Sequence, residues 1–179
     1  GQGYVLATPL QMANVVATVA NGGTRYRPHF VKRIDNAAGE VVEEIQPEVV
    51  GHAGLRKSTL LQIREALRDV VNAPNGTGKK AKLPNIDVGG KTGTSQVFKM
   101  GKQVKTNNMP RHLRDHAWFV AFAPVDDPEI AIAVLIEHAG GGGGALAAPI
   151  AHDVADFYFA LTRGRSYQLA PAEPRRDEA

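Results

Sequence analysis

Two apolar runs separated by a short turn constrain the fold of this chain more than any other feature of its sequence. Residues 116–123 and 130–137 are the two runs, and Pro124-Val125-Asp126-Asp127-Pro128 between them favours a turn. A connection this short joins antiparallel strands. In the second run both alternating sets of side chains are apolar, which is typical of a strand covered on both faces. The sequence therefore predicts an antiparallel hairpin buried between two layers.

Three helices are predicted around this hairpin. The first starts at Thr8-Pro9-Leu10-Gln11, which combines an N-cap, a proline at the first helical position and a capping box. It is expected to end near Ala20, before the stop signal Asn21-Gly22-Gly23. Apolar residues at helical spacing predict a second, amphipathic helix over residues 58–71 and a long third helix over residues 145–161.

The remaining segments are predicted to be connections or surface structure. The runs 29–34 and 40–45 are expected to form a surface hairpin. The five glycines of residues 140–144 are interpreted as a flexible linker, residues 99–110 as a mobile polar loop, and residues 164–179 as a disordered tail. The order of elements predicts an α+β fold, with an antiparallel sheet covered by helices.

Composition excludes several classes of function. Among 179 residues, 21 are Lys or Arg and 18 are Asp or Glu, and a net charge of +3 is too small to indicate nucleic-acid binding. The absence of cysteine excludes disulfides, thiolate metal sites and a cysteine nucleophile. The histidines show no metal-ligand spacing, so neither a metal nor another cofactor is expected. No apolar run approaches the roughly 18 residues of a membrane span.

A cation, two hydroxyls and a glycine stand together in Lys91-Thr92-Gly93-Thr94. One interpretation is a phosphate loop, because Gly90-Lys91-Thr92 matches the end of the G-x-x-x-x-G-K-[ST] pattern. However, Asn85 stands where the first glycine of that pattern should be, and residues 94–98 alternate like a strand instead of opening a helix. We therefore favour a strand, whose glycine lets a substrate approach the backbone and whose edge can pair with an extended peptide.

Several segments together resemble the class B penicillin-binding proteins, over about residues 1–160. They are Gly1-Gln2-Gly3, residues 8–13, Asn21-Gly22-Gly23, residues 90–94, Ala117-Trp118-Phe119 and Phe122-Ala123-Pro124. Residues 111–116 are similar to the elongation-specific subgroup, penicillin-binding protein 2 of the rod-shape system. The resemblance implies a β-lactamase/transpeptidase-like fold that is incomplete here. Residues 1–163 would form the C-terminal part of the transpeptidase domain.

The resemblance also implies an activity: a D,D-transpeptidase that cross-links peptidoglycan stem peptides through a serine ester and is acylated by β-lactams. Lys91 would supply positive potential, and the Thr92 and Thr94 hydroxyls would bind the substrate carboxylate. The Thr94 backbone N–H would be an oxyanion donor. Gly93, Ser95 and Gln96 would complete the substrate-binding strand.

The nucleophile of this family is absent from the chain. Ser58, Ser95 and Ser166 are its serines, and none begins an S-x-x-K or S-x-N motif. The chain also begins at Gly1 without an initiator Met. We therefore expect a fragment that is inactive on its own.

The resemblance implies stem peptides and β-lactams as ligands, and a SEDS-type glycosyltransferase of the elongation machinery as a partner. It implies the periplasmic face of the inner membrane, with an N-terminal anchor that is not in this chain. Three alternatives stay open: a serine β-lactamase, a D,D-carboxypeptidase and a penicillin-sensing receptor domain. The first two would hydrolyse the acyl-enzyme, whereas the receptor would keep it.

Overall fold

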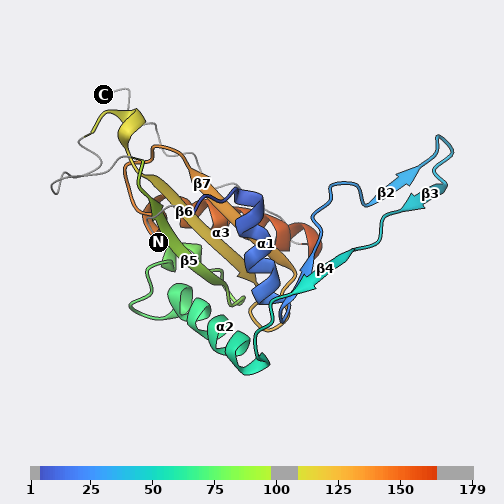
Figure 1. The fold of residues 1–179 in the computed structure, drawn as a ribbon, viewed down its shortest axis with the longest axis horizontal. Coiled ribbons are helices and arrows are strands. Elements are labelled where there is room, and N and C mark those ends of the chain that lie inside the picture. The colour runs from blue at the N-terminus through green and yellow to red at the C-terminus, as the bar shows by residue number, and fades with distance from the viewer. Residues whose placement is uncertain (1–4, 98–108, 165–179) are drawn as a thin grey trace.

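A computed structural model describes residues 5–97 and 109–164, and an antiparallel sheet lies at its centre (Figure 1). Within this part of the chain the strand order is β5-β6-β7. The strands are β5 (Gly89–Ser95), β6 (His116–Ala123) and β7 (Ile130–Ile136). Antiparallel pairing of β6 with β7 confirms the predicted hairpin.

Helices cover both faces of this sheet. α1 (Pro9–Ala20) lies in front of it in Figure 1, and α3 (Gly143–Thr162) lies behind it. Alternate side chains of β6 therefore enter two different cores: Phe119 is buried against α3, whereas Phe122 packs with Val16 of α1. Burial of each such aromatic side chain contributes on the order of 1.5–3 kcal/mol. Contacts of both helices with β7 confirm that this strand is covered on two sides.

Both ends of α1 follow the local signals of the sequence. The Gln11 N–H donates to the Thr8 hydroxyl at 3.2 Å, and the Thr8 N–H donates to the Gln11 side chain at 2.8 Å, which completes the capping box. At the other end the Gly23 N–H donates to the Thr18 carbonyl at 2.7 Å, and Gly22 has a φ of +85°. This Schellman arrangement requires a left-handed residue, which glycine supplies without strain.

The amphipathic helix α2 (Lys57–Asn72) begins and ends within one residue of its prediction and packs beside β5. Its last residue, Asn72, donates from its side-chain amide to the Val88 carbonyl at 2.8 Å, one residue before β5. Arg68 also forms a 2.6 Å ion pair with Asp87. These contacts fix the start of β5 against α2. A loop and the short 3₁₀ helix η1 (Lys79–Ala81) connect the two elements.

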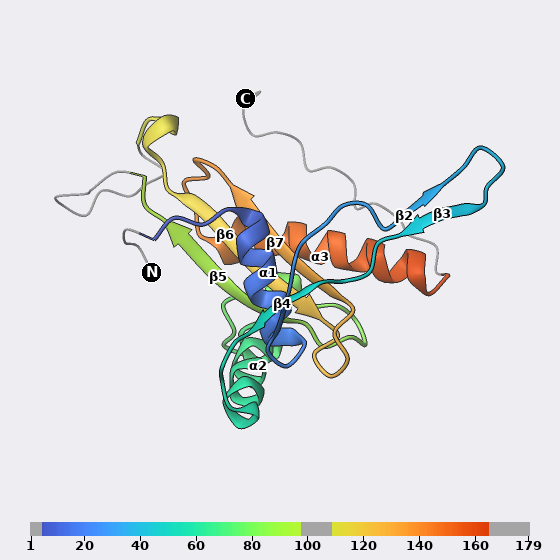
Figure 2. The same cartoon turned by 45° about the vertical axis from the view of Figure 1, so that its right-hand side comes forward.

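Residues 24–52 form an extension that projects from the sheet, clearly visible in Figures 1 and 2. It contains two antiparallel strand pairs, β1 with β4 and β2 with β3. The strands are β1 (Thr24–Tyr26), β2 (Arg33–Asp35), β3 (Val41–Glu44) and β4 (Val49–His52). The outer pair confirms the predicted surface hairpin with shorter strands, whereas the sequence does not predict the β1–β4 pair.

Other predictions need correction or lie outside the described residues. Gly143 and Gly144 form the first turn of α3, so the prediction of a flexible linker through residue 144 is wrong there. The predicted strand through residue 98 ends at Ser95. Most of the predicted mobile loop and nearly all of the predicted tail lie outside the described residues. The 3₁₀ helix η3 (Arg111–Leu113) precedes β6.

Candidate active-site strand

Strand β5, which carries Lys91-Thr92-Gly93-Thr94, lies at the edge of the sheet (Figure 1). One edge of β5 pairs with β6 along its whole length, and no strand among the described residues pairs with its other edge. In an antiparallel pair the backbone groups of alternate residues point away from the neighbour. The outer edge of β5 therefore offers N–H and C=O groups that no described strand uses. This arrangement confirms the strand interpretation of the segment over the phosphate loop.

The register of β5 on β6 assigns its side chains to two faces. Thr92 lies opposite Phe119, which is buried beneath α3, and Thr94 lies two residues further on the same face. Lys91 lies opposite Val120, which belongs to the core beneath α1. Lys91 is exposed, whereas both threonines are partly buried. The side chain of Lys91 and those of the two threonines thus leave the strand on opposite faces.

A hydroxyl and an ammonium group meet on β5. The Lys91 Nζ donates to the Thr92 carbonyl at 2.8 Å and lies 3.4 Å from the Thr92 Oγ1. On the other side the Thr92 Oγ1 is 3.2 Å from the Thr77 Oγ1. Because an ammonium group and a hydroxyl are both hydrogen-bond donors, this cluster suits a carboxylate ligand. Thr77, which lies in the loop between α2 and η1, belongs to the cluster, although no role is predicted for it from the sequence.

Glycines let neighbouring segments of the chain approach β5 closely. A Cβ atom on Gly90 would lie 2.7 Å from the Phe119 ring, and one on Gly93 would lie 3.1 Å from the Trp118 Cβ. At the start of α3, a Cβ on Gly143 would lie 1.9 Å from the Trp118 carbonyl oxygen and 2.8 Å from that of Gly93. A Cβ on Gly144 would lie 2.1 Å from the Thr77 carbonyl oxygen. The glycine run interpreted as a linker is therefore part of the packing around the candidate site.

The two remaining predicted site residues lie at the end of the strand. Ser95 is the last residue of β5 and pairs with His116, and Gln96 is exposed just beyond it. The ring of His116 accepts a hydrogen bond at its Nδ1 from the His138 backbone N–H, at 2.8 Å. This hydrogen bond links the first residue of β6 to the residue two positions after β7. In the described part of the chain no group of His, Asp and Glu is arranged to hold a metal ion.

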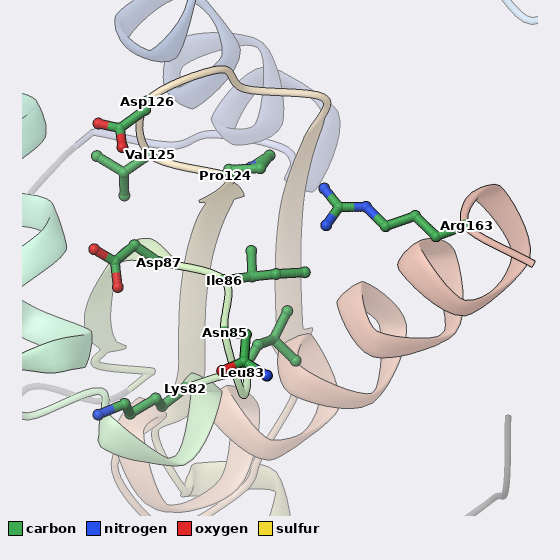
Figure 3. Close-up of a pocket in the computed structure, with 9 residues that line it drawn as sticks. All are labelled: Lys82, Leu83, Asn85, Ile86, Asp87, Pro124, Val125, Asp126 and Arg163. Carbon is green, nitrogen blue, oxygen red and sulfur yellow. The ribbon is translucent and has the colours of Figure 1, made fainter. Parts of the chain in front are cut away.

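A separate groove of about 460 Å³ lies at the other end of the sheet (Figure 3). Asp87, just before β5, and Pro124, just after β6, both line it, and Arg163 reaches toward it from the end of α3. Its charged groups are of both signs and are partly paired, Asp87 with Arg68 and Arg163 with Glu129. This groove therefore has no charge preference that would indicate a ligand.

Residues 1–156 match the family model of the penicillin binding protein transpeptidase domain. The chain belongs to this family. The peptidoglycan D,D-transpeptidase MrdA of Haemophilus influenzae is 41% identical over 99% of the chain, which covers 28% of that protein. This similarity confirms the prediction of a penicillin-binding protein of the elongation type.

Solved transpeptidase structures share the fold. Pseudomonas aeruginosa PBP2 in complex with WCK 5153 has a TM-score of 0.70 and 33% identity, covering 97% of this chain and 35% of that one. Penicillin-binding protein A from M. tuberculosis, as a ceftriaxone acyl-enzyme complex, has a TM-score of 0.72 and 31% identity. The match covers 87% of this chain and 33% of that one. The chain thus spans about a third or less of the length of these relatives. The predicted incomplete transpeptidase-like fold is confirmed.

Proposed function

We propose that this transpeptidase-domain chain forms one wall of the active site of a peptidoglycan D,D-transpeptidase, which cross-links stem peptides and is acylated by β-lactams. The observation that carries the proposal is the outer edge of β5, unpaired among the described strands, where the Lys91 ammonium and the Thr92 hydroxyl lie 3.4 Å apart. The serine nucleophile would come from a part of the protein outside these 179 residues, since no serine here begins an S-x-x-K motif.

The proposed mechanism assigns a role to each residue of the strand. The serine attacks the carbonyl between the two D-Ala residues, and the terminal D-Ala leaves with a proton. An amine of a neighbouring peptidoglycan strand then attacks the ester and displaces the serine. Lys91 supplies positive potential, and the Thr92 and Thr94 hydroxyls donate to the substrate carboxylate. The Thr94 N–H stabilises the oxyanion, a role whose loss typically costs about 100- to 1000-fold in rate. Gly93, Ser95 and Gln96 line the path of the extended substrate.

The valine substitution Gly93→Val in the full-length protein tests the proposed site. The Cβ of residue 93 would already lie 3.1 Å from the Trp118 Cβ, and the two added methyl groups would push β5 away from β6 next to Lys91 and Thr92. We expect covalent labelling by a fluorescent penicillin to be lost. Gly142→Ala is the control, because a Cβ there has no atom within 4 Å. Normal labelling of a folded Gly93→Val protein would contradict the assignment.

Kinetics of the intact protein separate the proposed activity from its alternatives. A transpeptidase forms a long-lived penicilloyl adduct and joins a donor stem peptide to an acceptor amine. Rapid turnover of β-lactam would instead indicate a serine β-lactamase, and release of D-Ala without cross-linking would indicate a carboxypeptidase. A stable adduct without either peptide reaction would indicate a sensor.

We also propose that the full-length protein acts at the periplasmic face of the inner membrane with a SEDS-type glycosyltransferase. Similarity to MrdA proteins supports a cell-envelope location. None of the described helices has the length and apolar character needed to cross a membrane. Membrane fractionation and co-purification of the full-length protein with the glycosyltransferase test this part of the proposal.

A further inference from the structure

Thr77 brings a second hydroxyl to the substrate strand from a different element. It lies between α2 and η1, 15 residues before Thr92, and its Oγ1 is 3.2 Å from the Thr92 Oγ1. Thr77 is itself exposed, so no burial of an apolar side chain explains its position. The contact joins an exposed hydroxyl to the residue that the proposed function uses to bind carboxylate.

The backbone around Thr77 is held on both sides. The Gly76 N–H donates to the Ala73 carbonyl at 3.0 Å, and the Gly78 N–H donates to the Val70 carbonyl at 2.8 Å. From the opposite direction the first turn of α3 approaches so closely that a Cβ on Gly144 would lie 2.1 Å from the Thr77 carbonyl oxygen. Although Thr77 is in an exposed loop, its backbone is therefore held close to β5, within reach of the Thr92 hydroxyl.

The contact with Thr77 determines which hydrogen bonds the Thr92 hydroxyl can still make. A threonine hydroxyl has one hydrogen to donate and two lone pairs to accept. The Lys91 ammonium, at 3.4 Å, can only donate to the Thr92 oxygen. If Thr77 also donates to that oxygen, the single hydrogen of Thr92 is left to point at a bound carboxylate. A hydroxyl that accepts in this way is also a stronger donor, because hydrogen bonds in a chain polarise one another.

We propose that Thr77 is a positioning residue, which orients and polarises the Thr92 hydroxyl for the carboxylate of the substrate or of a β-lactam. The inference rests on the proposed function, since it assumes that Thr92 binds this carboxylate. Thr77 itself acts through Thr92 and need not touch the substrate.

The isosteric change Thr77→Val in the full-length protein removes the hydroxyl and keeps the shape of the side chain. Because one neutral hydrogen bond is lost, we expect the second-order rate constant for acylation by penicillin G to fall about two- to ten-fold. Thr77→Ser should restore the rate. Thr92→Val should lower it as well, and the double variant should be no slower than Thr92→Val alone, since both remove the same interaction.

A penicillin whose carboxylate is esterified separates this role from a general effect on folding. With that ester, wild type and Thr77→Val should react at the same rate, because Thr92 has no carboxylate to bind. Thr162→Val is the matched control, because the Thr162 hydroxyl donates within its own helix, to the Tyr158 carbonyl. Its acylation rate should equal that of wild type with both compounds.

Three results would overturn the inference: a wild-type rate for Thr77→Val, multiplicative losses in the double variant, or an equal loss with the ester. A wild-type full-length protein that forms no adduct at all would instead overturn the proposed function, and this inference with it.

Discussion

At the scale of single residues, Gly143 has very little room for a side chain near the candidate site. Its Cβ would lie 1.9 Å from a backbone oxygen of Trp118, which cannot rotate away as a side chain could. Gly143→Ala should therefore push α3 off β6 and lower the free energy of unfolding by about 1–3 kcal/mol. Urea denaturation of the full-length protein measures this change.

The neighbouring glycine provides a matched comparison at the same scale. Gly142 is the N-cap of α3 and has a φ of −75°, and a Cβ added to it would have no atom within 4 Å. Gly142→Ala should lower the free energy of unfolding less than Gly143→Ala, because it meets no atom and loses only the N-cap preference for glycine over alanine. Equal effects of the two alanines would show that helix propensity, and not contact with β6, determines the stability of this turn.

At the scale of elements, the extension of residues 24–52 is held near its base by an exposed ion pair. Arg27 Nε lies 2.5 Å from a Glu48 carboxylate oxygen, and the Arg27 N–H donates to the Glu48 carbonyl at 2.9 Å. The hydrogen bond from the Arg27 side chain lowers the pKa of the Glu48 carboxyl below its ordinary value of 4.5. A carboxyl with a lowered pKa adds stability above its ordinary pKa and loses it as the pH falls through the folded value.

The lowered pKa of the Glu48 carboxyl can be measured by titration. Glu48 should titrate below 4.5 in the wild-type chain, and Arg27→Gln should return its pKa to the ordinary value. NMR titration of the side-chain carboxyl carbon provides the measurement. Added salt should reduce the difference, because both side chains are exposed. A wild-type Glu48 that titrates at the ordinary value would show that the ion pair does not persist in solution.

At the scale of the whole molecule, the proposed function requires a nucleophile from outside these 179 residues. Ser58, Ser95 and Ser166 are the serines of the 179 residues, and none of them has a lysine three residues later. We expect mass spectrometry to detect no penicilloyl adduct on this chain after incubation with penicillin G, whereas the full-length protein gains one. A stoichiometric adduct on the 179 residues would contradict the assignment of the nucleophile.

Elements governed by neighbouring residues can be predicted from the sequence. The capping box and glycine stop of α1 act within a few residues, and so do the apolar spacing of α2 and the short turn between β6 and β7. The β1–β4 pair could not be predicted, because its partners, such as Thr24 and His52, are far apart in the chain and are not joined by a short turn of their own. The linker interpretation of Gly143 is wrong for the same reason, since the need for glycine there arises from Trp118.

The sequence alone determined the chemistry of the candidate site: a lysine, two threonines and a glycine in strand alternation, together with motifs of the penicillin-binding transpeptidase family. Only the tertiary structure decided that this strand lies at the sheet edge, that α3 approaches it through glycines, and that the Thr77 hydroxyl lies beside Thr92. The physical reason is the distance along the chain over which each property is determined. Side-chain chemistry and strand periodicity are local properties, whereas a sheet edge and a contact between distant hydroxyls exist only after the elements have packed.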